Sequence, residues 1–280
     1  MNTALTKTMR TIPKIFDLIV KLIIVAIFIF PFLWMISMAL QTEREVNTFP
    51  ITLIPHVPQF KNIVTAWTSV PFAIYLQNSV VIIISIVCLQ MIIMIPAAYS
   101  FAKYDFKGKS FFFSLIIIAF MTPTQITFIP IYQMMAQLGW LRTLLPQIIP
   151  FMTNSFGIFL LRQYFMQIPN ELIEAAKLDK AGELKIIFRL MLPMSKAALT
   201  TIVLLSFISH WNEYFWPLVM TNSDYVRPIS IGVVRLRENE ALANWHIVMA
   251  GNMMFVLPVL IIYAFACRSI IKSFAYSGIK

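Results

Sequence analysis

A phosphate-binding loop is the first chemistry that this sequence could carry. Gly108, Lys109 and Ser110 match the end of the P-loop pattern G-x-x-x-x-G-K-[ST], in which backbone N–H groups and the lysine hold nucleotide phosphates. The pattern also requires a glycine five positions before Gly108, and that position is Lys103. The three residues therefore indicate a turn flanked by lysines, and we expect this chain to bind no ATP itself.

The histidines and cysteines offer no better catalytic or metal-binding arrangement. His56, His210 and His246 are scattered, and Cys88 and Cys267 both lie in apolar runs. Zinc sites need such ligands in closely spaced pairs. No G-x-S-x-G nucleophile elbow occurs among the seven glycines. We therefore expect neither a metal site nor an enzyme active site.

The composition indicates an all-α integral membrane protein. Of the 280 residues, 59% are hydrophobic and 12% are charged, and the mean hydropathy is +0.79. A soluble domain carries about 25% charged residues, so too little polar surface remains to cover a soluble globule. Crossing a bilayer takes roughly 20 apolar residues. We predict six transmembrane helices, at about Phe16–Leu40, Phe72–Phe101, Phe111–Ile131, Pro146–Phe165, Pro193–Pro217 and Ile247–Ile271.

The first and third of these helices have features that could interrupt or remove them. The first could be a signal peptide cleaved after Ser37-Met38-Ala39. However, its apolar run from Leu22 to Leu40 exceeds the 7–15 residues of a usual signal core, and we predict a retained helix. The third contains Pro123 and Pro130 in its second half. Because proline removes a backbone donor, we expect a kink or an early end near Met121–Pro123.

The net charge of +10 follows from the loops. Counted between the six helices, 16 of the 22 lysines and arginines lie on the side of the two termini. Cytoplasmic loops carry the excess of basic residues, so we predict that both termini are cytoplasmic. The 12 acidic residues divide evenly between the sides. The topology thus accounts for the basic charge, and no nucleic-acid partner is expected.

The cytoplasmic loop between the fourth and fifth helices, residues 166–192, contains a further predicted helix. Asn170 is a good N-cap, and Glu171 and Glu174 then lie near the positive end of the helix dipole. A short helix with small alanines on one side suits docking into a groove of another protein. The residues at spacings of three and four that share this side are Leu172, Ala175, Ala176 and Asp179.

This loop resembles the signature of the permease subunits of bacterial ABC importers, which reads E-A-A, three residues, G, nine residues, I-x-L-P. Glu174-Ala175-Ala176 matches the start, and Leu192-Pro193 falls at the required distance. Leu190 replaces the isoleucine conservatively, and the departure that matters is Lys180, which stands where the family has glycine; the nearest glycine is Gly182. Either the turn has moved to Gly182, or Lys180 adopts it at some strain.

The resemblance covers nearly the whole chain and is closest to the carbohydrate-uptake branch, the second membrane subunit of maltose-type importers. It includes the segments 169–176 and 211–218, the proline-rich external segment 50–71 and the tail 277–280. It implies a single transmembrane domain of residues 1–280 in the bacterial inner membrane, with a second permease subunit completing the solute path.

The resemblance also implies the remaining partners. Two cytoplasmic ATPase subunits would bind ATP and magnesium and would each receive a coupling helix, while an extracytoplasmic binding protein delivers the solute. This chain would hold no cofactor and no ATPase site of its own. The residues implied to contact the ATPase are Glu174, Ala175, Ala176, Leu178, Asp179, Lys180 and Gly182.

Polar side chains within the predicted helices are candidates for the solute path. Polar groups in hydrocarbon are costly unless they face a cavity or another helix. The alternative for each is an inter-helix hydrogen bond, worth on the order of 0.6 kcal/mol, and for any single residue we favour that alternative. Likewise, Trp211 could stack on a sugar or belong to an interfacial belt. The candidates are Asn78, Gln90, Gln125, Asn154, Trp211, Asn212, Glu213 and Asn252.

Three functional classes are compared on these features. An importer subunit explains the loop at 166–192. A stand-alone secondary transporter would need internal repeats, and no matching halves are evident; a channel or an assembly protein gives the loop no role. For the cargo, the resemblance favours mono- or oligosaccharides, and glycerol phosphate or its diesters remain the alternative.

Overall fold

The structure is a computed structural model that describes residues 2–240 and 244–276, with the surroundings of the side chains at 16–238 and 244–265. Over these residues the regular structure is entirely helical, as predicted. The tail motif at 277–280 lies outside the described residues. The chain divides into two compact units. The central unit comprises residues 71–232 and 257–280, and the N-terminal unit comprises residues 1–70 and 233–256.

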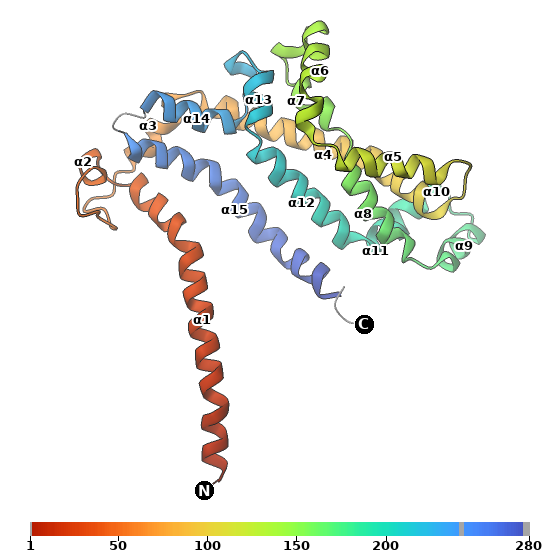
Figure 1. Ribbon diagram of the computed structural model, residues 1–280, viewed down its shortest axis with the longest axis horizontal. Coiled ribbons are helices and arrows are strands. Elements are labelled where there is room, and N and C mark those ends of the chain that lie inside the picture. The colour runs from red at the N-terminus through yellow and green to blue at the C-terminus, as the bar shows by residue number, and fades with distance from the viewer. Residues whose placement is uncertain (1, 241–243, 277–280) are drawn as a thin grey trace. The chain divides into compact units, whose positions relative to one another are not determined.

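The N-terminal unit is fastened together where its first helix ends. The buried Asn62 amide donates hydrogen bonds to Ala39 O (3.0 Å) and Gln41 O (2.8 Å). Every side chain from Phe16 to Leu33 is exposed, so this part of the helix offers its apolar surface to lipid or to another subunit. The helices of this unit, red to orange in Figure 1, are α1 (Asn2–Ala39), α2 (Glu43–Val46) and α3 (Lys61–Ser69).

The central unit is built on α4, a continuous helix from Phe72 to Lys103. α14 (Ile229–Glu240) and α15 (Trp245–Tyr276) each begin in one unit and end in the other. The remaining elements of the central unit are α5 (Lys109–Met121), α6 (Thr124–Gln137), η1 (Trp140–Arg142), α7 (Leu145–Ile148), η2 (Ile149–Phe151), α8 (Ser155–Met166), α9 (Asn170–Leu178), α10 (Glu183–Ile186), the π segment η3 (Ile187–Met191), α11 (Leu192–Met194), α12 (Lys196–Asn212), α13 (Phe215–Met220) and η4 (Asp224–Val226).

The core of the central unit lies where α4, α8 and α12 cross. Met94, Leu161 and Ile202 are almost fully buried there. Gly157 permits the close approach, because a Cβ at this position would lie 2.3 Å from Met94 Sδ and 3.2 Å from Ile202 Cγ2. Both distances are too short for ordinary packing, so a side chain at this residue would force Met94 and Ile202 to shift.

Three helices are long and apolar enough to cross a membrane, and they agree with the first, second and sixth predicted spans. They cover Phe16–Ala39 in α1, Phe72–Lys103 in α4 and Trp245–Phe265 in α15. Two bent helix pairs could supply further spans, which makes up to five in the described part of the chain.

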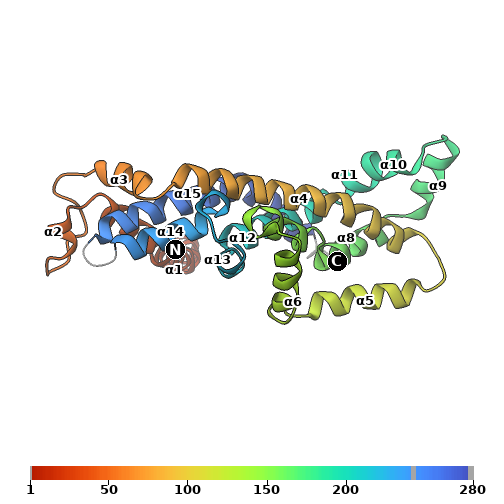
Figure 2. The same ribbon diagram turned by 90° about the horizontal axis from the view of Figure 1, so that it is seen from above.

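The third predicted span is broken where its prolines indicated. α5 ends at Met121, and α6 starts at Thr124 after a bend of 94°. Pro123 has extended backbone dihedrals and precedes the first residue of α6. The bend between α5 and α6 is visible in Figure 2. The expected early end near Met121–Pro123 is thus confirmed.

The prediction of a continuous fourth helix over Pro146–Phe165 is wrong. The chain forms the short α7 and η2, leaves helical geometry, and re-enters a helix only at Ser155. Asn154 causes the new start, because its backbone is extended and its side-chain Oδ1 accepts a hydrogen bond from Gly157 N at 2.8 Å. Pro150 adds to the break because it has no N–H to donate.

The fifth helix is also shorter than the predicted Pro193–Pro217. The helical segment before it bends by 84° at Ser195, so α12 starts at Lys196 rather than at Pro193. It ends at Asn212 because Glu213 has extended dihedrals, with φ −65° and ψ 119°. The Glu213 Oε1 atom then accepts a hydrogen bond from Trp216 N at 3.1 Å, near the start of α13.

Candidate functional site

The predicted loop helix exists as α9 and is fastened to the C-terminal end of α4 (Figure 1). The sequence predicted Asn170 as the N-cap of α9, and this is wrong. Pro169 occupies that position and makes no side-chain cap. Instead, the Asn170 Oδ1 atom accepts a hydrogen bond at 2.8 Å from the Lys103 ammonium group, which also donates to Ile168 O. The asparagine therefore holds α9 against α4.

The end of α9 resolves the departure at the family glycine position. Lys180 has φ 55°, in the left-handed region, whereas Gly182 has an ordinary φ of −69°. The Lys180 and Ala181 N–H groups donate to Lys177 O (2.9 Å) and Ala176 O (3.0 Å), which is the Schellman pattern of a helix end. The turn thus stays at residue 180, and Lys180 adopts the conformation that glycine would adopt without strain.

Exposure separates two sides of α9. Ile173 is buried and Ala176 is half-buried, and both pack on the core formed by α4, α8 and α12. Leu178 is 84% exposed although it is apolar. The other predicted contact residues are all exposed: Glu174, Ala175, Asp179, Lys180 and Gly182. Of the seven residues predicted to contact the ATPase, six, including Leu178, are therefore exposed, and only Ala176 faces the core.

A cluster that the sequence did not reveal joins α9, α10 and α4. The Glu183 carboxylate accepts a hydrogen bond from Tyr99 Oη at 2.7 Å and forms an ion pair with Lys177 Nζ at 3.1 Å. The Glu183 carboxylate also raises the pKa of both Tyr104 and Lys177, because its negative charge favours their protonated forms. We call Tyr99, Tyr104, Lys177 and Glu183 the Glu183 latch. No local pattern could have identified it, because Tyr99 and Glu183 are 84 residues apart.

Three of the candidate path residues are engaged in structural hydrogen bonds. Asn78 donates from Nδ2 to two backbone carbonyls of the η4 region, both at 2.9 Å. Gln90 donates to Phe151 O (2.9 Å) and accepts from Ser206 Oγ (2.8 Å). Asn154 caps α8 and lies 3.5 Å from the Gln90 oxygen. For these three, inter-helix or loop bonding is the observed role.

Three further candidates are occupied within or beside their own helices. Trp211 is buried and stacks on Phe207 with ring centroids 5.5 Å apart. Asn212 and Asn252 each donate to the backbone carbonyl four residues earlier, Ile208 O and Val248 O. Asn252 belongs to the N-terminal unit, and the other candidates belong to the central unit.

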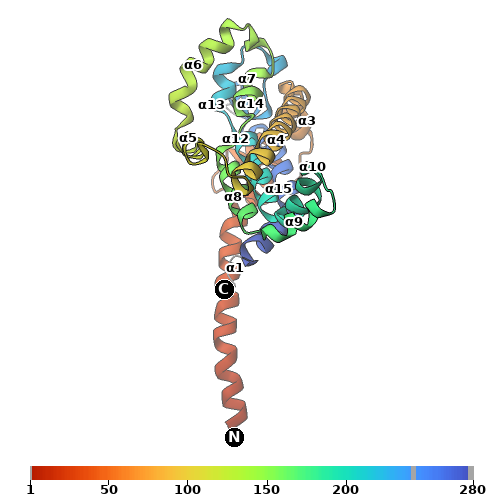
Figure 3. The ribbon, with the colours of Figure 1, turned by 90° about the vertical axis from the view of Figure 1, so that its right-hand side faces the viewer.

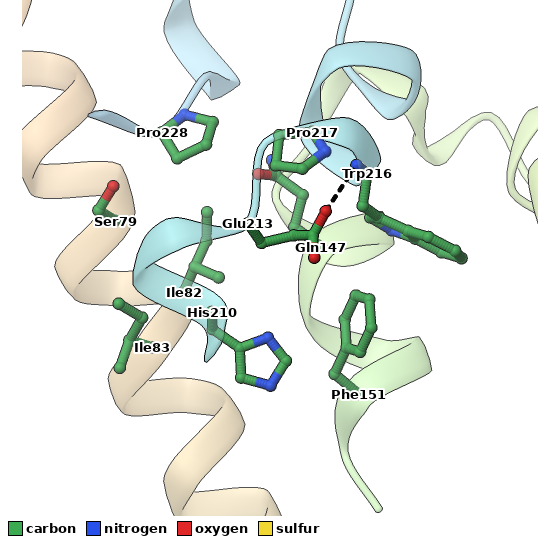
Figure 4. Close-up of a pocket in the computed structure, with 10 residues that line it drawn as sticks. All are labelled: Ser79, Ile82, Ile83, Gln147, Phe151, His210, Glu213, Trp216, Pro217 and Pro228. Atoms are coloured by element: carbon green, nitrogen blue, oxygen red, sulfur yellow. Dashed lines mark hydrogen bonds between the residues drawn. The ribbon is translucent and has the colours of Figure 1, made fainter. Parts of the chain in front are cut away.

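The last two candidates, Gln125 and Glu213, are brought together at one cavity. It has a volume of about 290 Å³, and its walls come from α6, η2 and α13. In Figure 3, α6 and α13 lie at one end of the central unit, apart from α9 and α10. A smaller cavity of about 20 Å³ adjoins Glu213, as shown in Figure 4. The lining of the larger cavity is Thr124, Gln125, Phe128, Phe151, Glu213, Phe215 and Trp216.

The aromatic rings around this cavity support one another. Phe128 lies 5.1 Å from Phe215 and 5.2 Å from Trp216, and Phe151 lies 5.1 Å from Trp216, as ring centroids. Such edge and tilted contacts are favourable aromatic arrangements. The Trp216 Nε1–H donates to Pro146 O at 2.8 Å, which fixes this ring. The cavity therefore combines aromatic walls with one carboxylate and one amide, and no lysine or arginine lines it.

The metal and phosphate candidates have no site-like surroundings in the structure. Within the described residues, no group of three or more His, Cys, Asp or Glu side chains could hold a metal ion. Gly108 has φ 84° and precedes α5, and Lys109 and Ser110 are the first residues of that helix. The three residues thus form the turn that the sequence indicated.

Comparison with protein families decides the class of this chain. Residues 94–276 match the family described as the binding-protein-dependent transport system inner membrane component. The chain belongs to this family. A member is an integral component of the inner membrane, and the matched region contains α9 and the larger cavity.

Curated relatives of this family member are permeases of ABC importers. The chain is 32% identical over 255 residues to the arabinooligosaccharides transport system permease protein AraQ of Halalkalibacterium halodurans, covering 90% of this chain and 91% of that protein. It is 31% identical over 252 residues to the sn-glycerol-3-phosphate transport system permease protein UgpE of Yersinia enterocolitica, covering 87% and 89%.

Solved structures of similar fold come from the same class of transporter. A chain of a bacterial ABC transporter that imports the acidic polysaccharide alginate superposes with a TM-score of 0.79 at 25% identity, covering 92% of this chain and 96% of that one. A second chain, from a bacterial alginate ABC transporter in complex with a periplasmic protein bound to an alginate pentasaccharide, has a TM-score of 0.61 at 18% identity. This family member is therefore a permease subunit of an ABC importer.

Proposed function

We propose that this permease forms half of a solute path and couples it to separate ATPase subunits through residues 166–192. The observation that carries the proposal is the two-sided character of α9. On its inner side, Asn170 is hydrogen-bonded to Lys103 of α4 and the Ile173 side chain is buried in the core. On its outer side, the apolar Leu178 is 84% exposed. An apolar side chain held rigidly in solvent favours a protein partner, and an ATPase cleft fits the family.

We also propose six membrane crossings with both termini in the cytoplasm, and a single transmembrane domain over residues 1–280. α8 has 12 residues and, at about 1.5 Å per residue, spans about 18 Å, which is short of a 30 Å hydrocarbon core. The fourth crossing therefore combines α8 with the segment from α7 onward. The third crossing combines α5 with α6, and the fifth is formed by α12.

The partners follow from this arrangement. A second permease subunit completes the path, and two ATPase subunits bind at the cytoplasmic side, where they supply the sites for ATP and magnesium. An extracytoplasmic binding protein delivers the solute. This chain contributes no ATPase site and no cofactor.

For the cargo we propose a neutral carbohydrate, carried past the cavity that Gln125 and Glu213 share. Its aromatic walls suit the apolar faces of sugar rings, and its carboxylate and amide can hydrogen-bond hydroxyl groups. A carboxylate without a neighbouring cation disfavours a phosphate. Glycerol phosphate or its diesters are the second candidate, supported by the 31% identity to UgpE.

The docking side of α9 is best tested at Ala175. Ala176→Trp would disturb the core, because Ala176 packs on it, whereas Ala175 is exposed. We expect Ala175→Trp to abolish co-purification of the ATPase while the chain still inserts into the membrane. Val64→Trp on α3, where the native side chain is 64% exposed, is the matched control and should retain the ATPase.

The same purification separates the functional classes. The unmodified chain should bring down an ATPase and a second permease. Recovery of the chain alone, with transport intact, would support a stand-alone transporter or channel and contradict the proposal. Uptake of labelled arabino-oligosaccharide compared with labelled sn-glycerol 3-phosphate, in cells with and without the gene, tests the cargo.

A further inference from the structure

Besides the Lys103–Asn170 hydrogen bond and the packing of Ile173, two routes lead from the C-terminal end of α9 to the membrane helices of the central unit. One follows the chain through α10, the π segment η3 and α11 into α12, and it bends by 84° at Ser195. The other leaves the chain at Glu183 and reaches Tyr99 on α4. α4 is one continuous helix, and its Gln90 is bonded to Ser206 on α12 and to Phe151 O.

The contacts of the Glu183 latch contribute unequally to its stability. Lys177 and Glu183 are 48% and 45% exposed, and an ion pair so open to solvent contributes little. Tyr99 is only 3% exposed, and its hydroxyl donates to the ionised Glu183 carboxylate at 2.7 Å. Hydrogen bonds to charged groups in partly buried surroundings are among the stronger ones. Most of the latch's strength is therefore in the Tyr99–Glu183 contact.

Aromatic packing holds the latch in position. The Tyr99 ring packs edge-on against Tyr104 and Phe165, with centroids 5.7 and 6.4 Å away. The Lys177 ammonium lies 5.5 Å from the centre of the Tyr104 ring, which is within cation–π distance. The Tyr99 hydroxyl is thus held at one place at the end of α4, and Glu183 has to stay beside it for the bond to persist.

We propose that Glu183 and Tyr99 are positioning residues that transmit the movement of α9 directly to α4. The inference rests on the proposed docking of the ATPase on α9. In this scheme the bend at Ser195 and the π segment leave the chain route compliant, whereas the latch joins α9 and α10 to an unbroken helix. When the ATPases move α9, α4 follows, and the hydrogen bonds of Gln90 carry the displacement to α12 and η2.

Hydrogen–deuterium exchange on the complete importer in lipid nanodiscs tests the latch. Peptides covering 99–106 and 170–180 are compared without nucleotide and with Mg-ATP plus vanadate. In the native complex we expect exchange of both peptides to change. In Tyr99→Phe and Glu183→Ala, the change at 170–180 should persist and the change at 99–106 should fall at least threefold. Tyr164→Phe, which removes a hydroxyl from α8 outside the latch, is the matched control and should behave as native.

The outcomes separate the latch from the docking proposal. If neither peptide of the native complex responds, ATPase docking on α9 is wrong and the latch fails with it. If 170–180 responds and 99–106 does not, or if the variants behave as native, the latch alone is wrong. A purely structural role for Glu183 would raise exchange in both nucleotide states and lower complex yield. Glu183→Gln, which keeps a side-chain oxygen that can accept from Tyr99 Oη, should retain at least half of the native response at 99–106.

Discussion

The two ends of the central unit use polar side chains in opposite ways. Around α9, polar groups bind one another and leave the apolar Leu178 exposed. Around α6 and α13, aromatic rings pack on one another and leave Gln125 and Glu213 facing a cavity. In our proposal one end binds a protein and the other admits a hydroxylated solute, and the crossing of α4, α8 and α12 lies between them.

A substitution at the crossing of α4, α8 and α12 should have the largest effect, because the crossing supports both ends of the central unit. Gly157→Val would place methyl groups against Met94 and Ile202, where even a Cβ is too close. We expect a loss of about 3 kcal/mol in stability, measured as a lower Tm in lipid nanodiscs. Both ends should fail together, with ATPase co-purification and uptake lost. A variant that loses only one function would show that the two ends are mechanically separate.

The Gln90 network should give the next largest effect. Gln90→Leu leaves Phe151 O and Ser206 Oγ without their partner. Membrane side-chain bonds average about 0.6 kcal/mol each, and buried unpaired groups cost more, so we expect a loss of about 1 to 2 kcal/mol. Ser206→Ala, which removes a single bond, should cost less. Equal thermal stability of both variants would argue against a role for Gln90 in joining the helices.

Glu213→Gln should separate the cavity from the scaffold. The amide oxygen can still accept from Trp216 N, so the Tm should stay near native. Hydrogen bonds to a charged group are worth about 1.5–3 kcal/mol, so uptake of a neutral oligosaccharide should fall about tenfold with ATPase co-purification unchanged. If uptake of sn-glycerol 3-phosphate rises instead, the carboxylate is excluding an anionic cargo, and the second candidate becomes the better one.

The smallest expected effect is at the end of α9. Lys180→Gly removes the left-handed strain, about 1–2 kcal/mol, and adds the entropic cost of glycine, about 0.5–1 kcal/mol, for a net gain of about 0.5 kcal/mol. Gly182→Ala is the matched control: Gly182 has a negative φ, and nothing lies within 4 Å of an added Cβ, so it should be neutral or slightly stabilising. Reversed signs would place the turn at Gly182. Thermal unfolding of both variants measures this.

The sequence predicted helices better than their interruptions. Proline marked the break at Pro123, yet Pro96 and Pro258 lie inside α4 and α15. A proline therefore does not reveal whether neighbouring helices tolerate the missing donor. The break at Asn154 depends on a cap and a crossing that only the folded chain provides. The bend at Ser195 follows Pro193 by two residues, but a proline at that place equally suits the first turn of a continuous helix, so it did not reveal the bend.

Site residues could be predicted where the contacts that place them are between residues close in sequence. The helix at 170–178 follows from a short pattern, although Asn170 has a different partner from the expected one. Contact of its exposed residues with an ATPase stays a prediction. Among the polar candidates in the helices, composition could not separate those that bond to neighbours, such as Gln90, from those that face a cavity, such as Glu213. Tyr99 escaped notice because its partner is distant in sequence.

The bare surface of α1 has a consequence for mapping the assembled importer. Since every side chain from Phe16 to Leu33 is exposed, exchanging one aliphatic residue for another there should leave the subunit's own folding nearly unchanged. A saturation scan of α1 would consequently report on its neighbours. Positions that reject such exchanges would trace the footprint of an adjoining polypeptide, and indifferent positions would mark lipid.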